Sequence, residues 1–235
     1  MRHQVYGTVA NLVHRLFPVT CYLCLEPGQR PALDLCAGCE ADFPRNAPAC
    51  LICAAPTSGT DAICRRCIRR DRAFDRAWAP YRYEFPLPEL IHRMKYRGAL
   101  PITRILGCLL GRRLAERGSL AVDAIVPVPL HAARERKRGY NQAREIAVFA
   151  AREVGLPVQD RLVRRMRETA EQTSLSAGAR RRNLNGAFMV EAGDVPERVA
   201  IVDDVLTTGA TAESLALALR RAGCRRIEVW AVARA

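Results

Sequence analysis

The run Val199-Ala-Ile-Val-Asp203-Asp204-Val-Leu-Thr207-Thr208-Gly209-Ala210-Thr211 shows most plainly how this chain folds. Its leading apolar residues, 199–202, predict a buried parallel strand, and residues 212–222 predict the amphipathic helix that follows. The polar residues between them then lie at the carboxyl end of a strand, which is where open α/β sheets bind their ligands. We therefore expect an α/β domain whose parallel sheet is flanked by helices.

The polar residues of this run suit a ribose phosphate. The threonine hydroxyls are donors, Gly209 allows the backbone to come close, and the start of the helix presents free N–H groups to a phosphate. The carboxylates of Asp203 and Asp204 can accept hydrogen bonds from the vicinal hydroxyls of a ribose. The alternative is an ordinary helix cap beside solvated acids, but a cap needs one such residue and this run has five. The candidate residues are Asp203, Asp204, Thr207, Thr208, Gly209, Ala210 and Thr211.

The cysteines indicate a second kind of site. Eight of the ten lie between Cys21 and Cys67 as four CxxC pairs, separated by 11, 10 and 10 residues. One CxxC turn supplies two converging thiolates and a second turn completes a tetrahedral zinc site, so four pairs predict two zinc ions. A disulfide scaffold needs an oxidising compartment, and four cysteines also serve iron–sulfur clusters, but the spacing favours zinc. The expected ligands are Cys21, Cys24, Cys36, Cys39, Cys50, Cys53, Cys64 and Cys67.

How the pairs combine is a separate question. Sequential sites would join the first pair to the second and the third to the fourth, whereas a cross-brace would join first to third and second to fourth. We favour the sequential arrangement because 10 or 11 residues suffice for a small hairpin knuckle. Both sites look closed, which indicates structural rather than catalytic zinc.

The contrast between a cysteine-rich start and an Ala-, Leu-, Val- and Arg-rich remainder predicts two domains in the 235 residues. We expect a zinc-binding domain over residues 1–70, with a short amphipathic helix within 9–19, and an α/β domain over residues 71–235. Within the latter, residues 121–126 predict a strand and 140–154 a helix, and Cys108 and Cys224 are expected to be buried, unreactive thiols.

Composition and charge narrow the class of partner. Apolar residues make up 49% and charged residues 26%, as in soluble globular proteins, and the patchy segment 9–19 is too short to span a membrane, so we expect a cytoplasmic protein. The net charge of +13 is concentrated in segments 131–144 and 161–182. Such concentration indicates an anionic partner, either a phosphorylated small molecule or a nucleic acid, although a solvated basic face is the plain alternative.

Several motifs together resemble a known family. The run 199–211 looks like the ribose-5-phosphate loop of type I phosphoribosyltransferases. Three further motifs accompany this run and the cysteine array, namely Val126-Pro-Val-Pro129-Leu130, Arg138-Gly-Tyr-Asn-Gln142 and Asn183-Leu-Asn-Gly-Ala-Phe188. Taken together, these motifs resemble the ComF family of competence-associated proteins. The resemblance covers nearly the whole chain. It implies a type I phosphoribosyltransferase-like sheet preceded by a small double zinc ribbon, with a hood at about 80–118 and a core at about 119–235.

The resemblance also implies roles for residues. Asp203 and Asp204 would hold the ribose hydroxyls as catalytic residues, residues 207–211 would cradle the 5-phosphate, and Mg²⁺ would accompany a bound phosphoribosyl diphosphate. The turn containing Val128, Pro129 and Leu130 would be the diphosphate loop, and residues 167–182 a loop closing over the site. Candidate anion contacts are Arg134, Lys137, Arg138, Asn141, Gln142 and Arg180. A solvated approach to a helix explains the basic residues equally well, and the two amides are also ordinary residues for the start of a helix.

One position departs from the family pattern. Members carry an acid after a Lys-Tyr-x-Gly turn, whereas this chain has Lys95-Tyr96-Arg97-Gly98-Ala99. The resemblance therefore implies no role for an acid at this position.

Two functions follow, and the sequence leaves both open. The first is a phosphoribosyltransferase that uses Mg²⁺-bound phosphoribosyl diphosphate or a related nucleotide, linked to DNA uptake in natural competence. The second is a non-catalytic protein of the same fold that binds single-stranded DNA and other competence proteins. The intact Asp-Asp and Thr-Thr-Gly elements disfavour a purely vestigial site.

Overall fold

The computed structural model describes residues 19–29, 33–59, 62–167 and 186–235. The chain forms two compact units, Met1–Phe43 and Pro44–Ala235. The second pair of CxxC turns thus lies in the same compact unit as the α/β core, although the sequence places the domain boundary near residue 70; that boundary stays a prediction. The helix predicted within residues 9–19 lies outside the described residues, apart from Val19.

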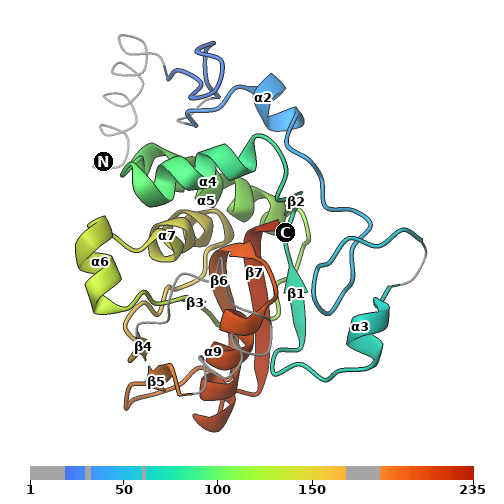
Figure 1. The fold of residues 1–235 in the computed structure, drawn as a ribbon, viewed down its shortest axis with the longest axis vertical. Helices are drawn as coiled ribbons and strands as arrows, with labels where there is room; N and C mark the ends of the chain where they lie inside the picture. The colour runs from blue at the N-terminus through green and yellow to red at the C-terminus, as the bar shows by residue number, and fades with distance from the viewer. Residues whose placement is uncertain (1–18, 30–32, 60–61, 168–185) are drawn as a thin grey trace, which may run out of the picture. The chain divides into compact units, whose positions relative to one another are not determined.

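The larger unit is built on a parallel sheet (Figure 1). Its strand order is β1-β7-β6-β3, with β2 pairing the end of β7 beyond β1, and every pairing is parallel. The strands are β1 (Arg76–Trp78), β2 (Tyr81–Arg82), β3 (Ala124–Pro127), β6 (Arg198–Leu206) and β7 (Arg226–Arg234). The predicted fold class is therefore confirmed. The strand predicted at 199–202 is longer, because β6 continues through the acid pair, and the one predicted at 121–126 begins at Ala124.

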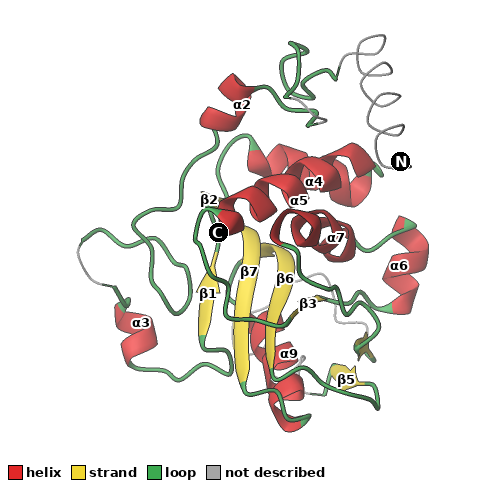
Figure 2. Ribbon diagram, turned by 180° about the vertical axis from the view of Figure 1, so that it is seen from behind, coloured by secondary structure: helices red, strands yellow, loops and turns green. Residues whose placement is uncertain are grey.

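Helices cover both faces of this sheet. Helix α9 (Ala210–Arg221) packs through Leu215 and Leu219 against alternate residues of β6 such as Val199 and Ile201. Helix α7 (Gln142–Val154) contacts β3 and β6, and α5 (Leu100–Ala115) packs on α7. Figure 2 shows α9 apart from the group formed by α5, α7 and α4 (Leu87–Tyr96). The helices predicted at 140–154 and 212–222 are thereby confirmed within two residues.

Two glycines allow α5 and α7 to approach closely. A Cβ on Gly107 would lie 2.7 Å from the carbonyl oxygen of Ile146, and one on Gly111 would lie 2.8 Å from that of Ala150. Both distances are shorter than real contacts, so any larger side chain would push the helices apart. The helices that support the ligand edge are consequently fixed by backbone contact.

Shorter elements complete the structure. In the described residues these are α2 (Ala37–Ala41) of the smaller unit and, in the larger unit, α3 (Arg65–Ile68), α6 (Ala132–Arg138) and the antiparallel pair of β4 (Val163–Arg165) with β5 (Phe188–Val190).

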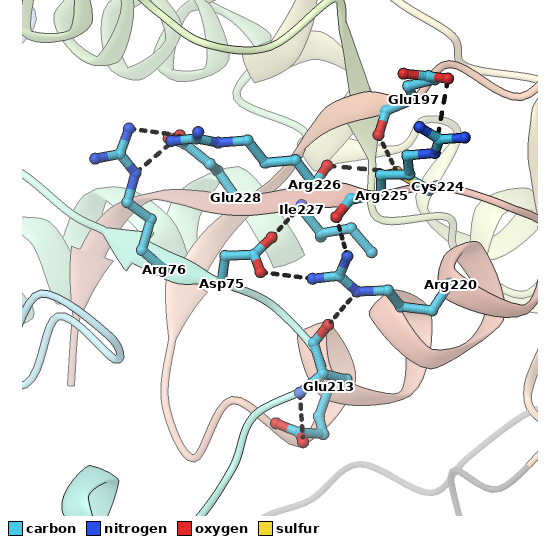
Figure 3. A network of polar contacts seen from close by, with 11 residues as sticks. Asp75, Arg76, Glu197, Glu213, Arg220, Cys224, Arg225, Arg226, Ile227 and Glu228 are labelled. Atoms are coloured by element: carbon cyan, nitrogen blue, oxygen red, sulfur yellow. Dashed lines mark hydrogen bonds and ion pairs between the residues drawn. The ribbon is translucent and has the colours of Figure 1, made fainter.

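A polar network joins β1, β7 and α9 (Figure 3). The buried Glu228 binds Arg76 at 2.6 Å, and Arg220 binds Asp75 at 2.7 Å. Cys224 belongs to this network, since it is buried and its thiol donates to the carbonyl oxygen of Glu197 at 3.3 Å. Burial raises the pKa of Cys224 and also that of Cys108, which is half-buried. A raised pKa disfavours the reactive thiolate form of both, as expected, but the prediction of burial is confirmed for Cys224 alone.

Candidate functional site

The acid pair is part of β6 rather than of the loop that follows it. Asp203 pairs in register with Ala231 of β7, and Asp204 is buried with 6% of its surface exposed. Each carboxylate accepts from the next backbone N–H: Asp203 Oδ1 from Asp204 at 2.9 Å and Asp204 Oδ1 from Val205 at 2.8 Å. These bonds orient both carboxylates at the carboxyl edge of the sheet.

Lys95 binds this acid pair from a distant part of the sequence. Its Nζ lies 2.6 Å from Asp204 Oδ2. Although burial alone would lower the pKa of Lys95, the carboxylates of Asp204 and Asp203 raise it. Burial and the neighbouring charge of Asp204 raise the pKa of Asp203 to about 7, since the lysine offsets only part of both effects. The sequence noted Lys95 in its turn but gave it no role at the acid pair, and 109 residues of separation leave no local signal of the contact.

The loop after β6 has the geometry expected of a phosphate cradle. Gly209 has φ +77° and lies at the N-cap of α9, a conformation that favours glycine. Ala210 N donates to Thr208 Oγ1 at 3.3 Å, and Thr207 is exposed while Thr211 is half-buried. The free amides of the first turn of α9 therefore lie next to threonine hydroxyls. Phosphate binding by these residues stays a prediction.

The turn after β3 is held in place by Asn141. Val128 is buried and its N–H donates to the carbonyl oxygen of Val202 at 2.9 Å, while Pro129 and Leu130 are half-buried. Asn141 Nδ2 donates to the carbonyl oxygen of Val128 at 3.1 Å, and Asn141 Oδ1 caps α7. Asn141 thus supports the candidate diphosphate turn from behind.

Gln142 is equally enclosed. It is 3% exposed and accepts from Arg138 Nη1 at 3.1 Å. The structure therefore gives both amides supporting contacts, and direct contact of either with an anion stays a prediction.

Basic side chains line a pocket beside the acid pair. The turn from α4 to α5 and helix α6 enclose about 630 Å³, and the lining residues are Lys95, Tyr96, Arg97, Gly98, Arg134, Lys137 and Arg138. Three of the predicted anion contacts, Arg134, Lys137 and Arg138, are thus brought together with Lys95. Arg180 and most of the segment 167–182 lie outside the described residues.

The cysteines form two tetrads with sequential pairing. The first tetrad consists of Cys21, Cys24, Cys36 and Cys39, and the second tetrad of Cys50, Cys53, Cys64 and Cys67; within each, the sulfur atoms lie within 4.8 Å of one another. The sequence prediction is therefore confirmed. All eight thiols are free of disulfide bonds. Burial and the neighbouring sulfurs raise the pKa of Cys67 to about 12, which means that they disfavour its thiolate. A bound dication would stabilise the thiolate, so the residues fit zinc.

The second tetrad is tied to the candidate ligand edge by Arg234. This buried arginine donates through Nε to the carbonyl oxygen of Cys53 at 3.2 Å and through Nη1 to that of Leu206 at 2.9 Å. Leu206 ends β6 and directly precedes the threonine loop. Arg234 therefore joins a turn of the second tetrad to the residue that precedes the threonine loop.

A second link runs through Glu213 in the first turn of α9. Glu213 accepts from the backbone N–H of Ala73 at 3.1 Å and binds Arg72 Nη1 at 3.3 Å. The same Arg72 nitrogen lies 3.5 Å from where a Cβ on Gly209 would be. The segment leaving the second tetrad thus binds the first turn of α9, which directly follows the threonine loop. The sequence carried no signal of either link, because both depend on tertiary pairing.

Searched over the described ranges, no helix of the chain is both long and apolar enough to cross a membrane.

Residues 12–68 match the family model of the double zinc ribbon domain. The chain is 36% identical over 210 residues to competence protein F of Haemophilus influenzae, covering 86% of this chain and 90% of that protein. It is 32% identical over 221 residues to the DNA utilization protein YhgH of Salmonella typhimurium, covering 92% and 97%. Among solved structures it is similar to the glutamine phosphoribosylpyrophosphate amidotransferase from B. subtilis complexed with ADP and GMP, with a TM-score of 0.38 and 19% identity over 56% of this chain and 26% of that one.

Proposed function

The chain belongs to the family of competence protein F and the DNA utilization protein YhgH, and from this premise we propose that it binds phosphoribosyl diphosphate or a related nucleotide with Mg²⁺ and acts in DNA uptake. The observation that supports the ligand is the acid pair at the end of β6, followed by the threonine loop and the left-handed Gly209. The cytoplasm is the compartment in which this role fits, since the nucleotide pool and imported DNA meet there.

Each part of the site has a role in this proposal. The carboxylates of Asp203 and Asp204 accept hydrogen bonds from the ribose hydroxyls, and the amides and hydroxyls of residues 207–211 bind the 5-phosphate. The turn at Val128–Leu130 receives the diphosphate. Oxygen donors of this kind suit Mg²⁺, which when bound neutralises charge on the diphosphate.

The reaction that such a site supports is transfer of ribose phosphate. The bond between C1 of the ribose and the diphosphate oxygen breaks, and the diphosphate leaves with the electron pair. The nucleophile of the acceptor forms the new bond to C1 and loses its proton to solvent. Basic side chains near the leaving group stabilise its charge, so this chain needs no covalent intermediate.

The test is calorimetric titration of zinc-loaded protein with phosphoribosyl diphosphate and Mg²⁺. We expect Asp203→Asn/Asp204→Asn to abolish binding while the circular dichroism spectrum and thermal transition persist. A matched control, Asp42→Asn/Asp194→Asn, removes two exposed carboxylates elsewhere and should bind as the wild type does. Normal binding by the Asp203/Asp204 variant would refute the site assignment.

The basic pocket favours a second candidate, a non-catalytic protein that binds single-stranded DNA on the same scaffold. Phosphate backbones bound by lysine and arginine release counterions, so affinity falls steeply with salt. We would titrate a short single-stranded oligonucleotide at two salt concentrations. Salt-sensitive DNA binding without any binding of phosphoribosyl diphosphate would select this function, and DNA binding that ignores salt would argue against it.

A further inference from the structure

The walls of the basic pocket come from other parts of the chain than the candidate diphosphate turn and the threonine loop. Its walls are the turn 95–98 and one side of α6. Neither the candidate diphosphate turn at Val128–Leu130 nor the threonine loop at 207–211 contributes a lining residue. The pocket is thus additional to the elements that would hold the ribose, its 5-phosphate and the diphosphate.

The charge of the lining is entirely positive. It comprises Lys95, Arg97, Arg134, Lys137 and Arg138, and among the described residues no carboxylate lines the same space. Lys95 is compensated by Asp204, whereas the side chains of Arg97 and Lys137 make no hydrogen bond or ion pair with the described residues and are exposed. Cations held together around a concavity repel one another and raise the local concentration of anions. A bound carboxylate or phosphate would relieve that repulsion.

The lining also offers an ordered ring. Tyr96 is 57% exposed, and the guanidinium carbon of Arg138 lies 5.5 Å from the centroid of its ring. The ring of His92 lies 4.8 Å from the same ring. A flat side chain held in this way beside cations suits a planar ligand that bears a negative group.

Lys95 places the pocket next to the ribose site. The residue lines the pocket, yet its Nζ lies 2.6 Å from Asp204 Oδ2. Tyr140, just before α7, donates its hydroxyl to the carbonyl oxygen of Met94, which fixes this end of α4. A ligand in the pocket therefore lies one side chain away from the carboxylates that would hold the ribose, where a second substrate has to be.

We propose that this pocket binds the acceptor of the transfer reaction, and that the acceptor is a planar heterocycle carrying a phosphate or carboxylate group. The inference rests on the proposed function, because an acceptor presupposes a ribose-phosphate donor. Arg97 and Lys137 bind the anionic group of the acceptor. A neutral nucleobase has no charge that can pair with these two cations, so the pocket selects against it.

The experiment compares anionic probes with neutral ones on zinc-loaded, full-length protein. The pairs are deoxyadenosine 5′-monophosphate with deoxyadenosine, and orotate with uracil, each titrated with and without phosphoribosyl diphosphate and Mg²⁺. A 5′-phosphorylated single-stranded oligonucleotide distinguishes a free nucleotide from the end of a strand. We expect at least one anionic probe to bind tenfold or more tightly than its neutral partner.

The variant Arg97→Gln tests the location, because Arg97 lines the pocket and is not among the candidate contacts of the donor. It should weaken the preferred anionic probe about tenfold and leave phosphoribosyl diphosphate within threefold of wild type. The control Arg161→Gln/Arg221→Gln removes two exposed arginines elsewhere and should change neither affinity. Equal loss of probe and phosphoribosyl diphosphate would assign the pocket to the donor and overturn the proposal, as would the absence of any preference for the anionic probes.

A separate outcome distinguishes this proposal from its premise. If the anionic probe binds through Arg97 but phosphoribosyl diphosphate does not bind at all, the transferase function fails while the anion pocket is supported. If phosphoribosyl diphosphate binds and neither anionic probe does, the transferase site stands and the acceptor class proposed here is wrong.

Discussion

The two cysteine tetrads have the same ligands and the same pairing, but they differ in what surrounds them. The first tetrad lies in the unit Met1–Phe43, where Cys24 is exposed and Cys36 and Cys39 are half-buried. The second tetrad lies in the unit Pro44–Ala235, where three of the four cysteines are buried. The same set of four cysteines thus occurs once in the small unit and once in the unit that contains the sheet.

The difference lies in the hydrogen bonds that leave the second tetrad. Arg234 links Cys53 to the end of β6, and Asn46 donates to the carbonyl oxygens of Ala54 and Ala79 at 2.9 and 3.1 Å. A metal that orders such a turn also orders whatever the turn is bonded to. Zinc at the second tetrad should therefore affect the candidate ligand site, whereas zinc at the first should not.

The largest expected effect comes from removing one metal at a time. Cys50→Ser/Cys53→Ser should lose one zinc, lower the main unfolding transition on the order of 10 °C and abolish binding of phosphoribosyl diphosphate, because a few kcal/mol of metal-linked folding energy disappear from the larger unit. Cys21→Ser/Cys24→Ser should also lose one zinc but leave that transition and that binding unchanged. Zinc content, calorimetric melting and titration measure this, and equal effects of the two variants would break the comparison.

The next effect isolates the link itself. Arg234→Met removes the donors to the carbonyl oxygens of Cys53 and Leu206 while keeping an unbranched apolar stem, and should lower the free energy of unfolding by about 2–3 kcal/mol. Arg198→Met serves as control, since its pairing with Asp123 is exposed to solvent and should contribute little to stability. Urea denaturation gives both values. A loss at Arg234 no larger than the control would mean that the second tetrad is not coupled through this residue.

A third effect concerns the support beneath the threonine loop. Arg72→Gln should weaken the binding of phosphoribosyl diphosphate about tenfold, which corresponds to about 1.4 kcal/mol. The reason is that Glu213 loses its ion pair with Arg72 close to the loop at Gly209. Arg65 offers a matched control, because it is an exposed arginine that directly follows Cys64 of the second tetrad. Arg65→Gln should bind phosphoribosyl diphosphate as the wild type does. Calorimetric affinities decide between them; unchanged affinity in Arg72→Gln would limit the coupling to Arg234.

How much the sequence predicted depends on how local each signal is. The CxxC turns, the strand before Asp203 and the helix after Gly209 are contiguous patterns, and the structure confirms the tetrads, their pairing and both elements. The basic residues of α6 were likewise identified as a group, because they are neighbours in the chain.

The sequence did not predict which polar side chains pair when they lie far apart in the chain. Lys95 meets Asp204, and Arg234 meets Cys53, across separations that no periodicity encodes. The buried position of Asn141 beneath the turn at Val128 is of the same kind. Since one arginine among many looks like any other in the sequence, only packing decides which of them is buried and what it binds.

The smallest expected effect is a pH dependence confined to the larger unit. In the ligand-free chain Asp203 has a pKa of about 7, above that of an unfolded aspartate near 4, so its proton opposes binding of the ribose hydroxyls to the carboxylate. Affinity for phosphoribosyl diphosphate should therefore rise about threefold from pH 6.5 to 7.5. The sign for folding is the reverse, because the stabilisation from the retained proton is lost as pH rises from about 4 through 7.

Carboxyl carbon NMR of Asp203, assigned with Asp203→Asn, measures the pKa directly and calorimetry gives the affinity profile. The first-tetrad variant should show the same pKa and the same profile as the wild type, because its cysteines belong to a different compact unit from the one that contains β6. Arg234→Met should instead shift both, since Leu206 lies three residues beyond Asp203 on the same strand. A pKa near 4 in the wild type would mean that Lys95 compensates the acid pair fully, and the pH dependence would then vanish while the difference between the tetrads remained.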